Sequence, residues 1–195
     1  MENKEISRLV AKTFGKLKRS VLGLTGLRVV ELREDDVLVR AGRPAAECFL
    51  VIDGIVVEYF AKATDDVIRL VGPGGLLGVD ELFASRRATC SHTLAAGTSC
   101  RVLAMSLGEL EELARRDGAF AEELYRLMVG VAGERTLRGR FLRGNNGTER
   151  AEELMTRFGW SGRPPLKWKT IASYLGMNIC ALSRSVARLR NSRGL

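Results

Sequence analysis

The first 22 residues carry apolar side chains at helical spacing. In residues 3–22 the apolar positions recur every three or four residues, and lysines and arginines fill the positions between them. Gly23 and Gly26 interrupt the pattern, as helix-terminating residues do. The spacing therefore predicts a short amphipathic helix over residues 3–22.

Between Leu27 and Met105 the pattern changes to short apolar and β-branched runs separated by turn residues. Asp53-Gly54 stands between two such runs and predicts a two-residue hairpin turn, because that turn needs the positive φ that glycine tolerates. Many short strands at this spacing predict an antiparallel sandwich or barrel. The predicted strands are residues 27–32, 37–40, 48–52, 55–60, 67–71, 89–95 and 101–105.

Helical periodicity returns at Ser106, which is a good N-cap with Glu109 as its capping-box partner. After a break at Asp117-Gly118, the apolar positions continue to residue 142 and predict a helix of about 25 residues, roughly 37 Å long. In a chain this small, such a helix indicates a connection between two domains or packing against a second copy. An ordinary core helix with a frayed end is the alternative.

Charge is divided unevenly along the chain. The net charge is +8, but residues 1–134 hold 18 basic and 20 acidic side chains, whereas residues 135–195 hold 13 and 3. The front part is therefore near −2 and the back part near +10, with no acidic residue after Glu153. A strongly basic segment indicates a polyanionic partner, and nucleic acid is favoured. An anionic membrane surface is the weaker alternative, because glycines and prolines interrupt the segment.

The sequence lacks the residues that several classes of protein function require. No apolar run approaches the ~20 residues of a membrane span, and the charged N-terminus lacks the apolar stretch of a secretory signal, so a cytoplasmic protein is expected. The four cysteines are scattered without CxxC spacing, which predicts small, mostly buried side chains. With His92 as the one histidine, no Ser/His/Asp set and no P-loop lysine after residues 72–75, we expect neither an enzyme nor a metal site.

Residues 169–189 have the pattern of a helix-turn-helix. Ala172 is small where the second helix would cross the first, Gly176 can adopt the positive φ of the turn, and Asn178 can cap the second helix. Before these helices, residues 143–147 predict a linker, Thr148 predicts the start of a helix running to about residue 158, and residues 159–165 predict a loop. The positions expected to be buried around the turn are Ile171, Leu175, Met177, Leu182 and Val186.

In such a motif the second helix lies in the major groove of DNA, with its N-terminal and outward residues facing the base edges. Arg184 can bind a guanine through both terminal nitrogens or clamp a phosphate, and lysines near the first helix contact phosphates. A helical hairpin with a solvated basic face is the alternative. The predicted DNA-binding residues are Lys167, Lys169, Thr170, Asn178, Ile179, Cys180, Ser183, Arg184 and Arg188.

From about residue 27 to its end, the chain resembles the Crp/Fnr superfamily of bacterial transcription regulators. The resemblance is carried by Leu32–Gly42, Phe49–Val56 and Val71–Gly78 in the front part, and by Leu175–Met177 and Leu182–Leu189 in the back part. It implies an α+β chain with an antiparallel β-roll of the double-stranded β-helix or jelly-roll type. A long dimerisation helix and a C-terminal winged helix-turn-helix would follow, with the wing truncated at Gly194-Leu195.

The resemblance also implies an organisation and partners. Residues 1–117 would form the N-terminal helix and an effector-type β-roll, residues 118–143 the dimerisation helix, and residues 144–195 the DNA-binding domain. The protein would bind double-stranded DNA at a palindromic operator as a homodimer. RNA polymerase is a further candidate partner, and no membrane is expected.

Relatives that bind cyclic AMP carry a Gly-Glu pair for the ribose and an Arg-Ser pair for the cyclic phosphate. Here Gly78 precedes Val79, with Asp80 and Glu81 close behind, and the second pair reads Cys90-Ser91. Without a guanidinium the phosphodiester loses its strongest hydrogen bonds, so cyclic AMP is not expected in the usual mode, although Arg86 and Arg87 could substitute. The candidate effector pocket comprises Gly78, Val79, Glu81, Cys90, Ser91 and His92.

Other effectors of the family are also limited by the residues present. The iron–sulfur branch uses an N-terminal cysteine cluster, and no cysteine precedes Cys48, so no iron–sulfur cluster is expected. Haem would need His92 or Cys90 as a ligand. An unknown small ligand, or no effector, is the remaining interpretation.

The recognition helix departs from the family as well. Ile179-Cys180 stands where an Arg-Glu pair is usual, so the DNA target is expected to differ from the common one. The leading hypothesis is a sequence-specific transcriptional regulator. The alternative is a haem, gas or small-ligand sensor that signals through a protein partner with a degenerate helix-turn-helix. Steep salt dependence of binding would favour the first.

Overall fold

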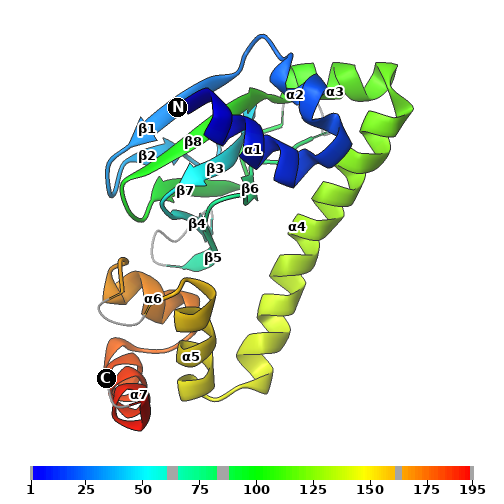
Figure 1. Cartoon of the computed structure of the whole chain (residues 1–195). Helices are drawn as coiled ribbons and strands as arrows, with labels where there is room; N and C mark the ends of the chain where they lie inside the picture. The colour runs from blue at the N-terminus through cyan, green and yellow to red at the C-terminus, as the bar shows by residue number, and fades with distance from the viewer. Residues whose placement is uncertain (1, 61–65, 83–87, 161–163, 194–195) are drawn as a thin grey trace.

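The computed structural model describes residues 2–60, 66–82, 88–160 and 164–193. Two sheets form a roll, and helices α1, α2 and α3 cover one side of it (Figure 1). The long helix α4 runs past the roll to the C-terminal helices α5, α6 and α7. The helical bounds are α1 Glu2–Phe14, the 3-10 turn η1 Gly15–Leu17, α2 Lys18–Leu22, α3 Leu107–Arg116, α4 Gly118–Gly144, α5 Gly147–Arg157, α6 Trp168–Tyr174 and α7 Ile179–Arg193.

The roll consists of two four-stranded sheets with antiparallel pairing throughout. One sheet has the order β1-β8-β3-β6 and the other β2-β7-β4-β5. This arrangement confirms the predicted antiparallel β-roll. The strands are β1 Arg28–Leu32, β2 Val37–Val39, β3 Glu47–Asp53, β4 Val56–Phe60, β5 Val67–Val71, β6 Leu76–Leu77, β7 His92–Ala96 and β8 Cys100–Ser106.

Strand β3 is apolar without interruption because both of its faces are covered. Phe49 and Val51 point into the roll and pack with side chains of β4, β5 and β8. Cys48, Leu50 and Ile52 point the other way, into the core formed with α1, α2, α3 and the first part of α4. A strand buried on both faces reads as a continuous hydrophobic run rather than an alternating one.

The predicted hairpin at Asp53-Gly54 is wrong. Strand β3 pairs with β6 and β8, while β4 pairs with β5 and β7, so the chain crosses from one sheet to the other at this point. Gly54 does have the positive φ that the pattern indicated, at 76°. The reason for the glycine is close packing, since a Cβ there would lie 2.4 Å from both Ser99 O and Cys100 Cβ.

The helices largely follow the predicted pattern, with two local corrections. The N-terminal helix is divided at Gly15, which has a φ of 52°. The fifth helix is capped by Asn146 rather than Thr148, since the Asn146 side chain accepts hydrogen bonds from the Thr148 and Glu149 amides. The long helix is continuous for 27 residues, as the spacing predicted.

The C-terminal helices pack against the end of the second sheet. Leu166 lies against the roll so closely that a Cβ on Gly97 would come within 2.6 Å of Leu166 Cδ2. The Val67 amide donates to Ser173 Oγ at 2.9 Å, which joins β5 to α6. One hydrophobic core therefore includes Ile55 of the roll together with side chains of α5, α6 and α7. In the part of the chain that the structure describes, no helix is long and apolar enough to cross a membrane.

Candidate functional site

Helices α6 and α7 are joined by a tight turn that contains the predicted features. Gly176 has a φ of 62°, and the Asn178 side-chain oxygen Oδ1 accepts a hydrogen bond from the Ala181 amide at 2.8 Å. Ala172 and Leu175 before the turn and Leu182 after it are buried, so apolar side chains pack on both sides of the turn. The turn therefore fixes where α7 begins and which face it turns outward.

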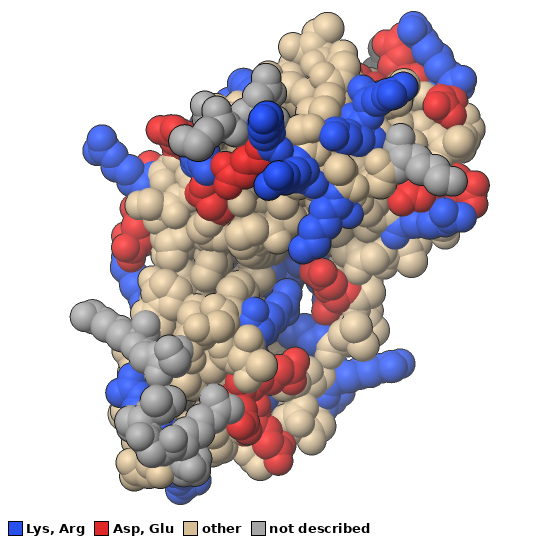
Figure 2. Space-filling view, in the orientation of Figure 1, with Lys and Arg blue, Asp and Glu red and all other residues tan. Residues whose placement is uncertain are grey.

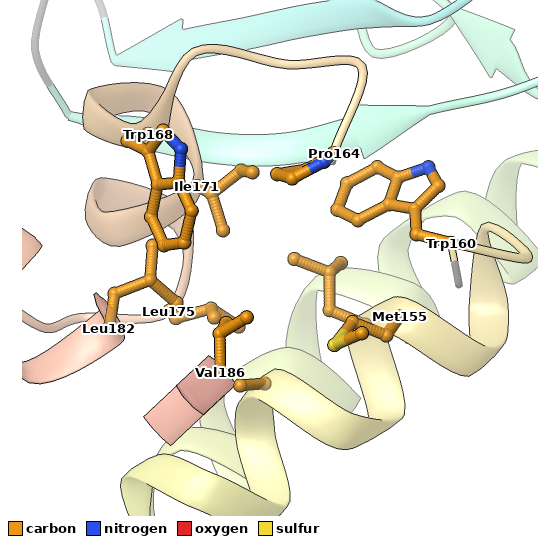
Figure 3. Close-up of a pocket in the computed structure, with 10 residues that line it drawn as sticks. Met155, Trp160, Pro164, Trp168, Ile171, Leu175, Leu182 and Val186 are labelled. Carbon is orange, nitrogen blue, oxygen red and sulfur yellow. The ribbon is translucent and has the colours of Figure 1, made fainter. Parts of the chain in front are cut away.

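The buried face of α7 belongs to a small apolar core. Figure 3 shows side chains of α5, α6 and α7 converging with Trp160 and Pro164. Together they line a cavity of about 20 Å³. Leu182 and Val186 reach this core from α7, and Met155 reaches it from α5. The core holds α7 against the other helices, so its outward side chains have a defined position.

The outward face of α7 carries the residues predicted to read DNA. Ile179 is 48% exposed although it is apolar, and the side chains of Ser183, Arg184 and Arg188 are also exposed. The face has i, i+3, i+4 spacing, opposite the buried Leu182 and its neighbours. The structure thus brings together Asn178, Ile179, Cys180, Ser183, Arg184 and Arg188 on one exposed surface.

The predicted contacts before the turn lie in a different environment. Lys167 forms an ion pair with Asp35 and lies 3.7 Å from Glu34 Oε1, both in the turn after β1. Lys169 is exposed and Thr170 is half-buried on α6. The Lys167 ammonium is therefore bound by the roll, and a phosphate would compete with carboxylates for it.

Acidic side chains of the basic C-terminal segment are confined to one helix. The acids in residues 135–195 are Glu149, Glu152 and Glu153, and all three belong to α5. Figure 2 shows acidic side chains gathered over this helix and basic ones over α1. Helices α6 and α7 themselves contain no acidic residue.

The cysteines only partly match the prediction of mostly buried side chains. Cys48 and Cys100 are buried, and burial raises the pKa of their thiols to about 12 and about 11. Cys90 is half-buried and Cys180 is exposed at the start of α7. The pKa of Cys90 is also raised, mainly by burial.

The candidate effector pocket is a small cavity inside the roll. Of the six residues, Gly78, Glu81, Cys90 and His92 line the same cavity, whereas Val79 packs in the core beneath α1 and α3, and Ser91 is exposed. Its volume is about 10 Å³, close to the minimum for one water molecule. Neither a nucleotide nor a haem fits into that volume without movement of these side chains.

The pocket also contains charged residues that the sequence did not reveal as a group. Glu58 of β4 is 2% exposed and is paired across the strands with Arg69 of β5, whose Nη1 lies 3.3 Å from its carboxylate. His92 Nδ1 lies 3.2 Å from Glu58 Oε1 on the same sheet. The sequence did contain a signal for this cluster, since Glu58 and Arg69 stand at buried positions of otherwise largely apolar strands.

Helix α4 reaches this cluster with two consecutive residues. Arg135 forms ion pairs with Asp80, at 2.7 Å, and with Glu58, while Glu134 lies 2.8 Å from Arg69 Nη2. Burial alone would lower the pKa of Arg135, but the hydrogen bonds to Asp80 and the charge of Glu58 outweigh it and raise the pKa. The guanidinium therefore stays charged inside the site.

The described residues do not fit an anionic cyclic nucleotide. Glu47, Glu58, Asp80 and Glu81 place four carboxylates around the pocket. The Ser91 amide, at the position expected for a cyclic phosphate, donates instead to Glu81 Oε1 at 2.8 Å. Arg86 and Arg87, considered above as substitutes, lie outside the described residues.

Comparison with known proteins identifies the front part of the chain and its fold. Residues 29–117 match the cyclic nucleotide-binding domain family. No curated protein matches the sequence. Among solved structures, FixK2 from Bradyrhizobium japonicum aligns with a TM-score of 0.72 and 18% identity, covering 85% of each chain.

Two further structures cover nearly the whole chain. A candidate cyclic nucleotide binding protein from Ruegeria pomeroyi has a TM-score of 0.71 and 19% identity over 98% of this chain and 89% of its own. The regulator CLP from Xanthomonas campestris has a TM-score of 0.61 and 20% identity over 97% and 92%. The chain therefore has a Crp/Fnr-like fold, in which residues 29–117 match the cyclic nucleotide-binding domain.

Proposed function

We propose that this protein is a cytoplasmic, sequence-specific DNA-binding transcriptional regulator of the Crp/Fnr superfamily, and not an enzyme. The observation that carries the proposal is the outward face of α7, which is exposed, lacks acidic residues and follows a capped tight turn. CLP, which shares the fold, is described as a global regulator responsive to cyclic di-GMP that links cell–cell signalling to virulence gene expression.

On this proposal α6 and α7 form a helix-turn-helix, and α7 lies in the major groove. Arg184 binds a guanine edge or a phosphate, and exposed Ile179 contacts a thymine methyl group. Lysines and arginines near the turn contact phosphates, so affinity falls steeply with salt. Because Ile179 and Cys180 replace a charged pair, the preferred sequence differs from that of relatives with Arg-Glu.

Homodimerisation through α4 is supported by an apolar stripe on that helix. Tyr125, Val129 and Leu137 are 65%, 51% and 62% exposed, and Gly133 completes their i, i+4 spacing. The stripe lies on the side of α4 opposite Phe120, Leu124 and Val131, which pack on the roll. A second copy would cover it, and a two-fold dimer binds a palindromic operator. RNA polymerase is a further partner on this proposal.

The test is selection of bound fragments from genomic DNA by the purified protein at two salt concentrations. Recovery of a palindromic motif whose binding falls with salt supports a DNA-reading dimer. Arg184→Ala should weaken binding to that motif by about 10- to 100-fold, since a guanine contact contributes roughly 1–3 kcal/mol. Arg115→Ala, which removes an equal charge from α3, is the matched control and should leave binding unchanged. Salt-insensitive binding to a protein partner, without DNA recovery, would refute the proposal.

A further inference from the structure

Two carboxylates that line the β-roll pocket, Glu58 and Asp80, are bound by a guanidinium that comes from outside the roll. Arg135 extends from α4, and its Nη1 and Nη2 each lie 2.7 Å from one oxygen of Asp80. Nη2 also donates to Glu58 Oε1. This fork-on-fork geometry is the one in which guanidinium groups bind carboxylates most strongly.

We propose that the β-roll pocket is a guanidinium-binding site whose ligand is Arg135 of the chain itself. The pocket keeps the position of an effector site, but its charge favours a cation instead of an anionic nucleotide. Four carboxylates line it, and among the described residues no lysine or arginine belongs to its lining. The Arg135 guanidinium supplies positive charge to two of them, Glu58 and Asp80, while Glu47 is paired with Arg28 and Glu81 accepts from the Ser91 amide.

Glu58 shows why the site requires an occupant. Its carboxylate is 2% exposed, and one oxygen is bound by Arg69 while the other faces Arg135 and His92. Removing one partner of a buried ion pair is strongly destabilising, because the remaining charge is left without compensation. Arg69 alone must also serve Glu134 and the Leu76 carbonyl, to which it donates at 3.3 Å.

The binding of Arg135 also sets the position of α4. Glu134 and Arg135 attach two consecutive residues of the helix to the roll. Arg138, one turn later, donates to carbonyls of both β5 and α6. Given the proposed regulator function, the roll therefore positions the DNA-reading helices without an added effector, since the chain provides the ligand.

The experiment is chemical rescue of Arg135→Ala by ethylguanidinium, with thermal unfolding as the readout. The variant should lose about 5–10 °C in Tm, as expected for a broken, largely buried pair in a chain of this size. Low-millimolar ethylguanidinium should restore at least half of the loss. Sodium chloride at equal ionic strength should not, and ethylguanidinium should not raise the Tm of Arg140→Ala, which removes an exposed arginine from the same helix.

A second variant keeps the test decisive if Arg135→Ala does not fold. Asp80→Asn removes the negative charge that the Arg135 guanidinium binds. Because Asp80 is only partly buried, this substitution should not prevent folding. This variant should have a lowered Tm that ethylguanidinium cannot restore, because the carboxylate charge and one of the two acceptor oxygens are gone. Unchanged Tm in both variants, or rescue no better than with salt, would overturn the proposal.

Two binding measurements separate this inference from the regulator function. Calorimetric titration of the wild-type protein with cyclic AMP should show no binding, and micromolar affinity would overturn the cation site. DNA binding by Arg135→Ala should recover with ethylguanidinium in parallel with Tm. If Tm is rescued while even the wild-type protein binds no DNA, the pocket assignment stands and the regulator function fails.

Discussion

Replacing Arg138 by methionine should loosen the C-terminal helices from the roll. Arg138 Nη2 donates to Val67 O and to Tyr174 O, each at 2.8 Å, and its guanidinium carbon lies 4.9 Å from the centre of the Tyr174 ring. Burial lowers the pKa of Arg138, which shows that the group loses hydration in this position. This side chain therefore joins α4 to both β5 and α6.

The magnitude follows from these contacts. A hydrogen bond from a charged donor contributes roughly 1.5–3 kcal/mol, which we reduce to about 1 kcal/mol each because the side chain is partly solvated and desolvation opposes it. The cation–π contact adds about 0.5–1 kcal/mol. Loss of about 2–3 kcal/mol corresponds to a roughly 30- to 150-fold larger population of undocked helices.

Hydrogen–deuterium exchange tests this expectation. Peptides covering β5 and α6 should exchange faster in Arg138→Met, while those covering β3 should not change. Arg140→Met is the matched control, since Arg140 is exposed on the same helix. Equal exchange in the two variants would show that the Arg138 contacts do not hold the helices, and the reasoning would be refuted.

Three further predictions concern the dimer, the packing and the pH dependence. Leu137→Glu should raise the dimer dissociation constant, measured by analytical ultracentrifugation, about 100-fold, since it places a charge in the apolar stripe of α4. Val37→Glu, at an exposed position on strand β2, is the control and should leave the constant unchanged. Gly54→Ala should lower the free energy of unfolding in urea by roughly 3 kcal/mol, because its Cβ would lie 2.4 Å from neighbouring atoms at a residue with positive φ. Gly108→Ala is the control and should leave the free energy of unfolding unchanged, since its Cβ has room. Hydrogen bonds from Thr25 and the Gly26 amide hold the pKa of Glu109 below its ordinary 4.5. Its stabilisation is therefore present above pH 4.5 and is lost as pH falls through the lowered pKa. The Tm difference between wild type and Glu109→Gln should shrink on acidification, and a constant difference would contradict the assignment.

Local signals in the sequence were sufficient for much of the fold. The positive φ at Gly176 and the cap at Asn178 depend on neighbouring residues, so they were predictable. The same holds for Ser106, whose side chain accepts from the Glu109 amide. The true cap of α5 was also readable, since Asn146 and Glu149 have capping-box spacing and form both hydrogen bonds.

Features that depend on long-range pairing were not predictable. Asp53-Gly54 has hairpin chemistry, but the strands on either side pair with partners elsewhere in the chain. Strand β6 has two residues and too little pattern to recognise. The Glu109 carboxylate was expected to complete a capping box, yet it accepts hydrogen bonds from Thr25 and Gly26, more than 80 residues away in sequence.

The candidate site divides in the same way. The exposed face of α7 follows from helical period, so its residues could be listed from sequence. The charged cluster could not, because Glu58, Asp80 and Arg135 come from separate segments that meet only in the folded chain.

The length of α4 gives the protein a mechanical property. At 1.5 Å per residue, its 27 residues form a rod of about 40 Å, attached to the roll near its middle and to the C-terminal helices at its end. From Arg135 to its end at Gly144 the helix spans about 14 Å, so a tilt of about 5° about this attachment moves the end by roughly 1 Å, about a third of the ~3.4 Å spacing of successive base pairs. A change at Arg135 too small to alter the fold would therefore move the end of α4 by a fraction of a base-pair step, which on the proposed function would alter the contacts of α7 with DNA and not its register.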